Sequence, residues 1–119
     1  MNDKRSIPVA QYDGKTLVAK YRNITLAAEM SGAQPAHIGK VTNGVRNTAG
    51  GFHWKTLTSF DGKLSNKRTG IVQKDTGGNV LAVYSDLDAA AYMTGISKDK
   101  IEAVMEGTKR SVSGYIFAS

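Results

Sequence analysis

Short runs containing apolar residues flank a Gly-containing turn in two places along the chain. Residues 7–12 and 16–21 flank a DGK turn, and residues 71–75 and 80–84 flank a longer DTGGN turn. Two short runs joined by a Gly-containing turn are typical of paired antiparallel strands. The pattern therefore predicts two β-hairpins, one in each half of the chain.

A short helix is predicted directly after each hairpin, at residues 24–31 and 87–94. An Asn or Asp stands where the N-cap belongs, and a Gly follows the last helical position, as is common at helix ends. The capping residues are Asn23 and Gly32 for the first helix and Asp86 and Gly95 for the second.

A second helix is predicted a few residues later in each half. Pro35 suits the first turn of one helix, and Ser97 is a good N-cap for the other. Apolar residues three apart face the same side of each helix. They are Ile38 and Val41 in the first helix and Ile101 and Val104 in the second, and the helices stop at Gly44 and Gly107. Final strands are predicted at 52–54 and 115–117.

The two halves align with each other. Residues 21–54 and 84–117 match without a gap, and nine of the 34 positions are identical. A repeated supersecondary unit explains such a match. The sequence thus predicts an α+β protein of two tandem units, each a hairpin, a helix-turn-helix and a terminal strand. The predicted domains are 1–55 and 71–119, and 56–70 is a basic linker.

Composition narrows the possible chemistry. The chain of 119 residues has no cysteine and only two histidines, so we expect no disulfide, no bound metal and no cofactor, although a metal site of His and carboxylate groups remains an alternative. No apolar run approaches the length of a membrane span, and the charged N-terminus does not resemble a signal peptide. We expect a cytoplasmic protein without a membrane partner.

Positive charge is concentrated in the first part of the chain. Residues 1–70 hold eleven Lys or Arg and four acids, whereas residues 71–119 hold five bases and six acids. The net charges are therefore +7 and −1. A basic region of this kind suits a polyanion such as nucleic acid, although a merely soluble basic protein remains an alternative.

The first unit resembles the intron-encoded nuclease repeat, a modular DNA-binding domain found in phage and organellar homing endonucleases. The matching positions are Ile24, Ala27, Ala28, Met30, Gly32, Ile38, Val41, Gly44, Thr48, Ala49, Gly50, Gly51, Phe52 and Trp54. The second unit keeps the skeleton but departs from the pattern at 111–117. The resemblance implies double-stranded DNA binding with the second helix in the major groove. It also implies a phage or mobile-element origin, and a bacterial host cell in which the bound protein associates with the nucleoid.

The face of the second helix opposite Ile38 is small and polar, which suits close approach to a groove floor. Lys40 can contact guanine or phosphate, and Asn43 can pair with adenine. The candidate DNA-binding residues of this region are Gln34, Ala36, His37, Gly39, Lys40, Asn43, Arg46, Asn47 and Thr48. Further candidates are the basic residues Lys55, Lys63, Lys67, Arg68, Lys109 and Arg110. Trp54 is expected in the core.

The matching face in the second unit is acidic. Asp99, Glu102 and Glu106 occupy the positions of Ala36, Gly39 and Asn43. Their charge opposes phosphate, so the acids either form a solvated surface or meet a protein partner or a second copy of the chain.

No catalytic motif of a homing endonuclease is visible in the sequence, so we expect a protein that is not an enzyme. The predicted function is a sequence-specific DNA-binding repressor or site-blocking factor. Two alternatives remain: a phage protein-interaction module that inhibits a host protein, and an accessory subunit that brings a separate nuclease to DNA.

Overall fold

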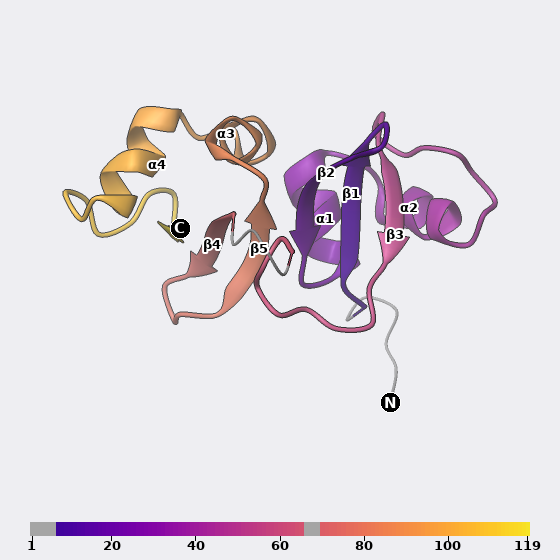
Figure 1. The fold of residues 1–119 in the computed structure, drawn as a ribbon, viewed down its shortest axis with the longest axis horizontal. Helices are drawn as coiled ribbons and strands as arrows, with labels where there is room; N and C mark the ends of the chain where they lie inside the picture. The colour runs from indigo at the N-terminus through magenta and orange to yellow at the C-terminus, as the bar shows by residue number, and fades with distance from the viewer. Residues whose placement is uncertain (1–6, 66–69) are drawn as a thin grey trace. The chain divides into compact units, whose positions relative to one another are not determined.

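The computed structural model describes residues 7–65 and 70–119 and has mixed α+β architecture, which confirms the predicted fold class. The chain divides into two compact units, Met1–Asp61 and Gly62–Ser119. In both, two strands, two helices and a final strand follow one another (Figure 1). Whether the units derive from one repeat, and whether the domain boundaries lie at 55 and 71, remain predictions from the sequence.

The first unit is a three-stranded antiparallel sheet with two helices on one face. Its strands are β1 (Val9–Asp13), β2 (Thr16–Tyr21) and β3 (His53–Thr56), and β1 lies between the other two. Its helices are α1 (Ile24–Ser31) and α2 (Pro35–Thr42), which lie behind the strands in Figure 1. The final strand begins one residue later than the sequence predicts.

The second unit has its own three strands and two helices. Strand β4 (Ile71–Asp75) pairs with β5 (Val80–Tyr84) and with β6 (Tyr115–Ala118), and both pairings are antiparallel. The helices are α3 (Leu87–Thr94) and α4 (Lys98–Met105). No helix in the described part of the chain has the length and apolarity needed to cross a membrane.

The first helix of each unit has the bounds and caps that the sequence predicts. Asn23 Oδ1 accepts a hydrogen bond from Leu26 N at 2.8 Å, and Asp86 Oδ1 accepts one from Ala89 N at 2.8 Å. Gly32 and Gly95 follow in the left-handed conformation, with φ of 79° and 73°. That conformation is strained for any residue with a Cβ atom, which explains a glycine at these helix ends.

The caps of the second helices are less regular. Pro35 begins α2, as predicted, and its missing N–H costs nothing at that position. Ser97 is the N-cap residue of α4, as predicted, but its side chain makes no capping hydrogen bond. Asp99 in the first turn offers the helix dipole a favourable charge instead.

Apolar side chains fill the space between helices and sheet in both units. Ile38 of α2 and Ile101 of α4 are fully buried, and Trp54 of β3 is 3% exposed. The Trp54 indole N–H donates to Ala49 O at 3.0 Å, which satisfies its polar edge inside the core. The predicted core position of Trp54 is confirmed, and its burial turns His53 and Lys55 to the opposite sheet face.

Candidate nucleic-acid interface

Helix α2 turns one face to the core and the other outward. Ile38 is fully buried, whereas Ala36, Lys40 and Asn43 are exposed and Gly39 is half-buried. A Cβ atom added to Gly39 would have no neighbour within 4 Å, so the space over this turn of the helix is open. The face that the sequence assigned to DNA is therefore accessible at the surface of the first unit.

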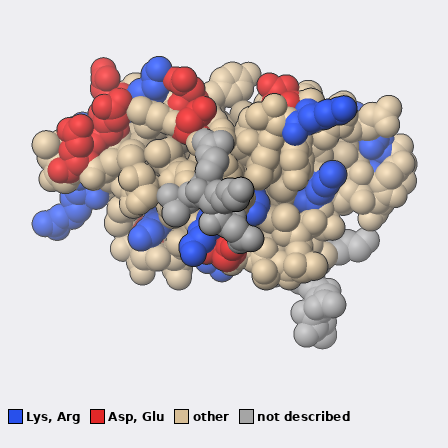
Figure 2. Space-filling model, viewed as in Figure 1, with Lys and Arg blue, Asp and Glu red and all other residues tan. Residues whose placement is uncertain are grey.

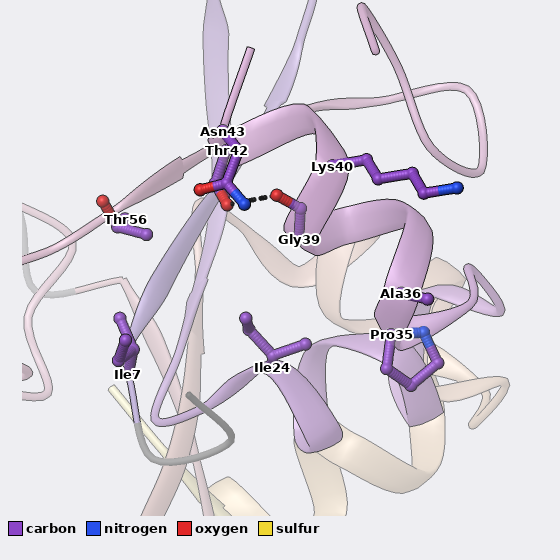
Figure 3. A pocket seen from close by; sticks show the side chains of 9 residues that line it. All are labelled: Ile7, Ile24, Pro35, Ala36, Gly39, Lys40, Thr42, Asn43 and Thr56. Carbon is purple, nitrogen blue, oxygen red and sulfur yellow. Dashed lines mark hydrogen bonds between the residues drawn. The ribbon is translucent and has the colours of Figure 1, made fainter. Parts of the chain in front are cut away.

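A cavity of about 380 Å³ lies beside this face. Figure 3 shows Ile7 and Ile24 on one side of it and the residues of α2 on the other, while the Lys40 ammonium points away from the two isoleucines. The lining residues are Ile7, Ile24, Pro35, Ala36, Gly39, Lys40, Thr42, Asn43 and Thr56. An apolar floor edged by an amide and an ammonium can accept a thymine methyl group beside polar base edges.

Hydrogen bonds fix the C-terminal end of α2. Thr42 Oγ1 donates to Gly39 O at 2.9 Å, and the backbone N–H of Asn43 donates to the same carbonyl at 3.0 Å. The chain then turns at Gly44, which has φ of 80°. The exposed side chain of Asn43 is thus held on a well-defined turn at the edge of the cavity.

The segment from α2 to β3 presents exposed polar groups next to the helix end. Arg46 Nε donates to Thr48 O at 3.2 Å, which holds the guanidinium close to the backbone of this loop. Arg46 and Asn47 are exposed, and Thr48 is half-buried. Val45 is 72% exposed, an apolar side chain that the sequence did not single out because nothing in its spacing marks it.

Gly50 and Gly51 form a tight turn at the end of this segment. Ala49 and Phe52 exchange both backbone hydrogen bonds across it, at 3.0 and 3.1 Å, and both glycines have positive φ. Phe52 is half-buried and packs edge-on against Trp54, with ring centroids 6.5 Å apart. The turn therefore fastens the loop that carries Arg46 and Asn47 to the core.

The remaining predicted contacts of the first part of the chain are dispersed. Gln34 is exposed just before α2, and His37 is half-buried within it. Lys55 is exposed on β3, and its ammonium lies 5.3 Å from the centroid of the Tyr12 ring. Lys63 is exposed, and the predicted contacts Lys67 and Arg68 lie outside the described residues.

The second unit carries acids on the outer face of α4. Ile101 and Val104 are buried, whereas Asp99, Glu102 and Glu106 are exposed. Figure 2 shows acidic side chains gathered over the region that Figure 1 labels α3 and α4. This face repels phosphate and differs in sign from the outer face of α2.

Cations flank the acidic face without neutralising it. Lys98 Nζ lies 2.6 Å from Asp88 Oδ1, and this hydrogen bond raises the pKa of Lys98 above its ordinary value. Lys109 and Arg110, both predicted DNA contacts, are exposed in the loop after α4. The described residues contain no group of three or more His, Cys, Asp or Glu side chains that could hold a metal ion.

The chain is similar to a protein of Enterobacteria phage T4 named "Probable mobile endonuclease B". The two are 32% identical over 133 aligned residues, which cover 93% of this chain and 50% of the phage protein. The chain therefore spans about half the length of this relative. No protein-family profile matches the chain, and no solved structure matches it significantly.

This similarity is to a phage protein named as a probable mobile endonuclease, and it contradicts one prediction from the sequence. The sequence predicts a protein that is not an enzyme, because it shows no catalytic motif of a homing endonuclease. The relative is named as an endonuclease, which is an enzyme, and its similarity extends over nearly the whole chain. A catalytic site can be built from side chains that no recognised motif marks, so the lack of such a motif does not argue against catalysis.

Proposed function

We propose that this chain binds double-stranded DNA in the service of a mobile endonuclease, with the outer face of α2 in the major groove. The observation that carries the proposal is the exposed, small and polar face of α2 beside a loop that carries the exposed cation Arg46. Ala36 and Gly39 leave room for the groove floor, and Lys40 and Asn43 supply a cation and an amide at its edge. The T4 relative makes DNA the natural ligand.

The proposed contacts have separate tasks. Asn43, at the edge of the cavity, reads base edges, because its amide can pair with adenine through two hydrogen bonds. Pro35 and Ala36 give apolar contact to a thymine methyl group. Lys40 and Arg46 neutralise phosphates, which strengthens binding to any sequence and positions the helix.

The second unit has a different proposed task. Its acidic outer face on α4 would be repelled by the phosphates that attract α2, so we assign Asp99, Glu102 and Glu106 to a protein partner or a second copy of the chain. Lys109 and Arg110 remain available for the DNA backbone. The repressor role depended on the absence of catalysis, so it is not carried further.

Selection from a random-sequence duplex library tests the proposal, followed by titration of the enriched duplex. The double variant Lys40→Glu and Arg46→Glu should abolish binding while its unfolding temperature stays near that of the wild type, because both side chains are exposed. The matched control Lys98→Glu and Lys100→Glu changes the same charge on α4. Equal losses in both variants, or no enriched duplex, would refute the assignment to α2.

The same duplex tests the endonuclease relationship. Incubation of the wild-type chain with the enriched duplex and Mg²⁺, followed by denaturing electrophoresis, measures strand cleavage directly. Cleavage places nuclease chemistry in this chain, and binding without cleavage limits the chain to DNA recognition.

A further inference from the structure

The first unit has a second basic surface, on the sheet face that its helices do not cover. The register pairs Tyr12 with His53 and Ala10 with Lys55. Directly paired residues of antiparallel strands, and alternate residues of one strand, point to the same side. Tyr12, His53 and Lys55 therefore share one face, whereas the buried Trp54 points toward the helices seen behind the strands in Figure 1.

A hollow of about 520 Å³ is present on this face at the end of the β1–β2 hairpin. Tyr12, Gly14, Lys15, His53 and Lys55 line it, so its charged lining residues are all basic. Lys15, His53 and Lys55 are exposed, and Tyr12 is half-buried. Blue Lys and Arg side chains are visible in Figure 2 over the strands of the first unit.

The aromatic ring organises this surface. The Lys55 ammonium lies 5.3 Å from the Tyr12 ring centroid, within the range of a cation–π interaction. This contact holds the lysine over the sheet rather than extended into solvent. Cations that line a groove attract the phosphates of a nucleic-acid backbone, and proteins that bind single strands combine such cations with an aromatic ring.

The second unit shows that the fold itself does not require this composition. At the same register, Lys74 pairs with Ile116 and Val72 pairs with Ala118. Where the first unit has His53 and Lys55, the second thus has isoleucine and alanine on an equivalent strand. The combination of a tyrosine ring with cations on the final strand belongs to the first unit, because the second unit has Lys74 in place of Tyr12.

We propose that this hollow binds the phosphodiester backbone of nucleic acid and is a second contact surface, separate from α2. Lys15 and Lys55 neutralise phosphates, His53 donates a hydrogen bond to a phosphate oxygen, and the Tyr12 ring packs on an adjacent sugar. The choice of DNA rather than an acidic protein follows from this pairing of ring and cations, and it rests on the proposed DNA-binding function. Because the helices occupy the other side of the sheet, the two surfaces hold different stretches of DNA.

The experiment measures affinity for a labelled random-sequence duplex between about 50 and 200 mM salt, where phosphate contacts dominate binding. The test variant is Lys15→Ala, His53→Ile and Lys55→Ala, and the last two changes introduce residues that the second unit carries at the same register. The control is Lys98→Ala and Lys100→Ala, which removes two exposed lysines elsewhere. Emission from Trp54, the only tryptophan, verifies folding of the first unit.

Loss of two phosphate contacts should lower the slope of log affinity against log salt by about 1.8 and weaken binding about tenfold or more at low salt. An unchanged slope, or a loss equal to that of the control, overturns the inference. If the variant does not fold, Lys15→Gln with Lys55→Gln tests the same point with most of both side chains retained. An equal loss with poly-glutamate as ligand assigns the surface to acidic protein and also overturns it.

The two proposals fail in different ways. One outcome is that the triple variant of Lys15, His53 and Lys55 shows a smaller slope of log affinity against log salt, while Lys40→Glu with Arg46→Glu binds normally. In that case the sheet face is the DNA surface and the assignment to α2 is wrong. The reverse pattern refutes the inference and leaves α2 as the DNA-binding surface.

Discussion

The hydroxyl of Tyr21 donates a hydrogen bond of 2.6 Å to Oε1 of Gln11, and both side chains are fully buried. The bond joins β2 to the central strand β1 on the face that the helices cover. In the second unit, Tyr84 makes the same bond to Gln73, also at 2.6 Å. A buried glutamine is rare unless its polar atoms are satisfied, so this pair explains a polar residue in the middle of each sheet.

Replacing Tyr21 with Phe removes the donor and leaves a buried carbonyl with one partner fewer. We expect the free energy of unfolding of the first unit to fall by about 1 to 3 kcal/mol. Urea unfolding followed by Trp54 fluorescence measures this directly, because the indole lies 6.1 Å from the Tyr21 ring. The control Tyr92→Phe removes a hydroxyl from a side chain of the second unit that is 74% exposed, and it should change the stability measured by circular dichroism by less than about 0.5 kcal/mol.

Burial also raises the pKa of Tyr21 well above its ordinary value. The folded state therefore keeps this proton at a pH where the unfolded state loses it, above about pH 10. Stability linked to Tyr21 is fully present below that pH and falls above it by about 1.4 kcal/mol per pH unit. Unfolding experiments between neutral and strongly alkaline pH should show a steeper loss for the wild type than for Tyr21→Phe. Parallel curves would contradict this role for the tyrosine.

Gly50 combines a left-handed backbone with close packing. Its φ is 61°, and an added Cβ would lie 2.9 Å from the Cβ of Ala33. Gly50→Ala should therefore destabilise the first unit by about 2 to 4 kcal/mol, from backbone strain and overpacking together. Gly51→Ala is the matched control, because φ is 86° there but no atom lies within 4 Å of the added Cβ. It should cost about 1 to 2 kcal/mol, and equal losses would show that the contact with Ala33 is unimportant.

Ser113 takes the position in the second unit that Gly50 takes in the first. Among the described residues it is the one non-glycine residue with positive φ, at 52°. Ser113→Gly should relieve strain and raise stability by about 0.5 to 1 kcal/mol, after the greater freedom of glycine in the unfolded chain is subtracted. Thermal unfolding followed by circular dichroism measures the gain. Ser111→Gly, at a residue outside the positive-φ region, should lower stability instead.

Lys40 and Asn43 should affect DNA binding differently. Lys40→Ala should weaken binding to all sequences and reduce the salt slope by about 1, because one phosphate contact is lost. Asn43→Ala should leave the slope unchanged and cost about 1 to 3 kcal/mol of discrimination between the enriched duplex and one with an altered base pair. Titrations of both duplexes at two salt concentrations separate these effects. A uniform loss in Asn43→Ala would show that it does not read bases.

Local signals in the sequence were enough to place the helices. Asn23, Gly32, Asp86 and Gly95 act through bonds to nearby backbone, so their effect can be anticipated from spacing alone. Pro35 acts in the same way. Ser97 shows the limit of such reasoning, because a residue type that can cap a helix does not have to make the bond.

The surfaces could not be predicted in this way. The cavity beside α2 brings together Ile7, Ile24 and Thr56, which lie far apart in the sequence. The contact between Tyr12 and Lys55 depends on the register between strands. The register of the β1–β2 pairing shifts between Gln11 and Tyr12, and no pattern of residues in the sequence predicts this shift. Packing between distant segments decides these features.

The position of β1 at the centre of its sheet has a consequence for synthesis on the ribosome. Its partner β2 follows within a few residues, but its partner on the other side, β3, is synthesised much later. There Thr56 pairs with Val9. Until β3 emerges from the ribosome, one side of β1 has unpaired backbone groups that can pair with a neighbouring nascent chain. Trp54, which packs in the core, is also still absent during this time. Slow translation through the loop before β3 would therefore favour aggregation, and rapid translation would favour completion of the unit.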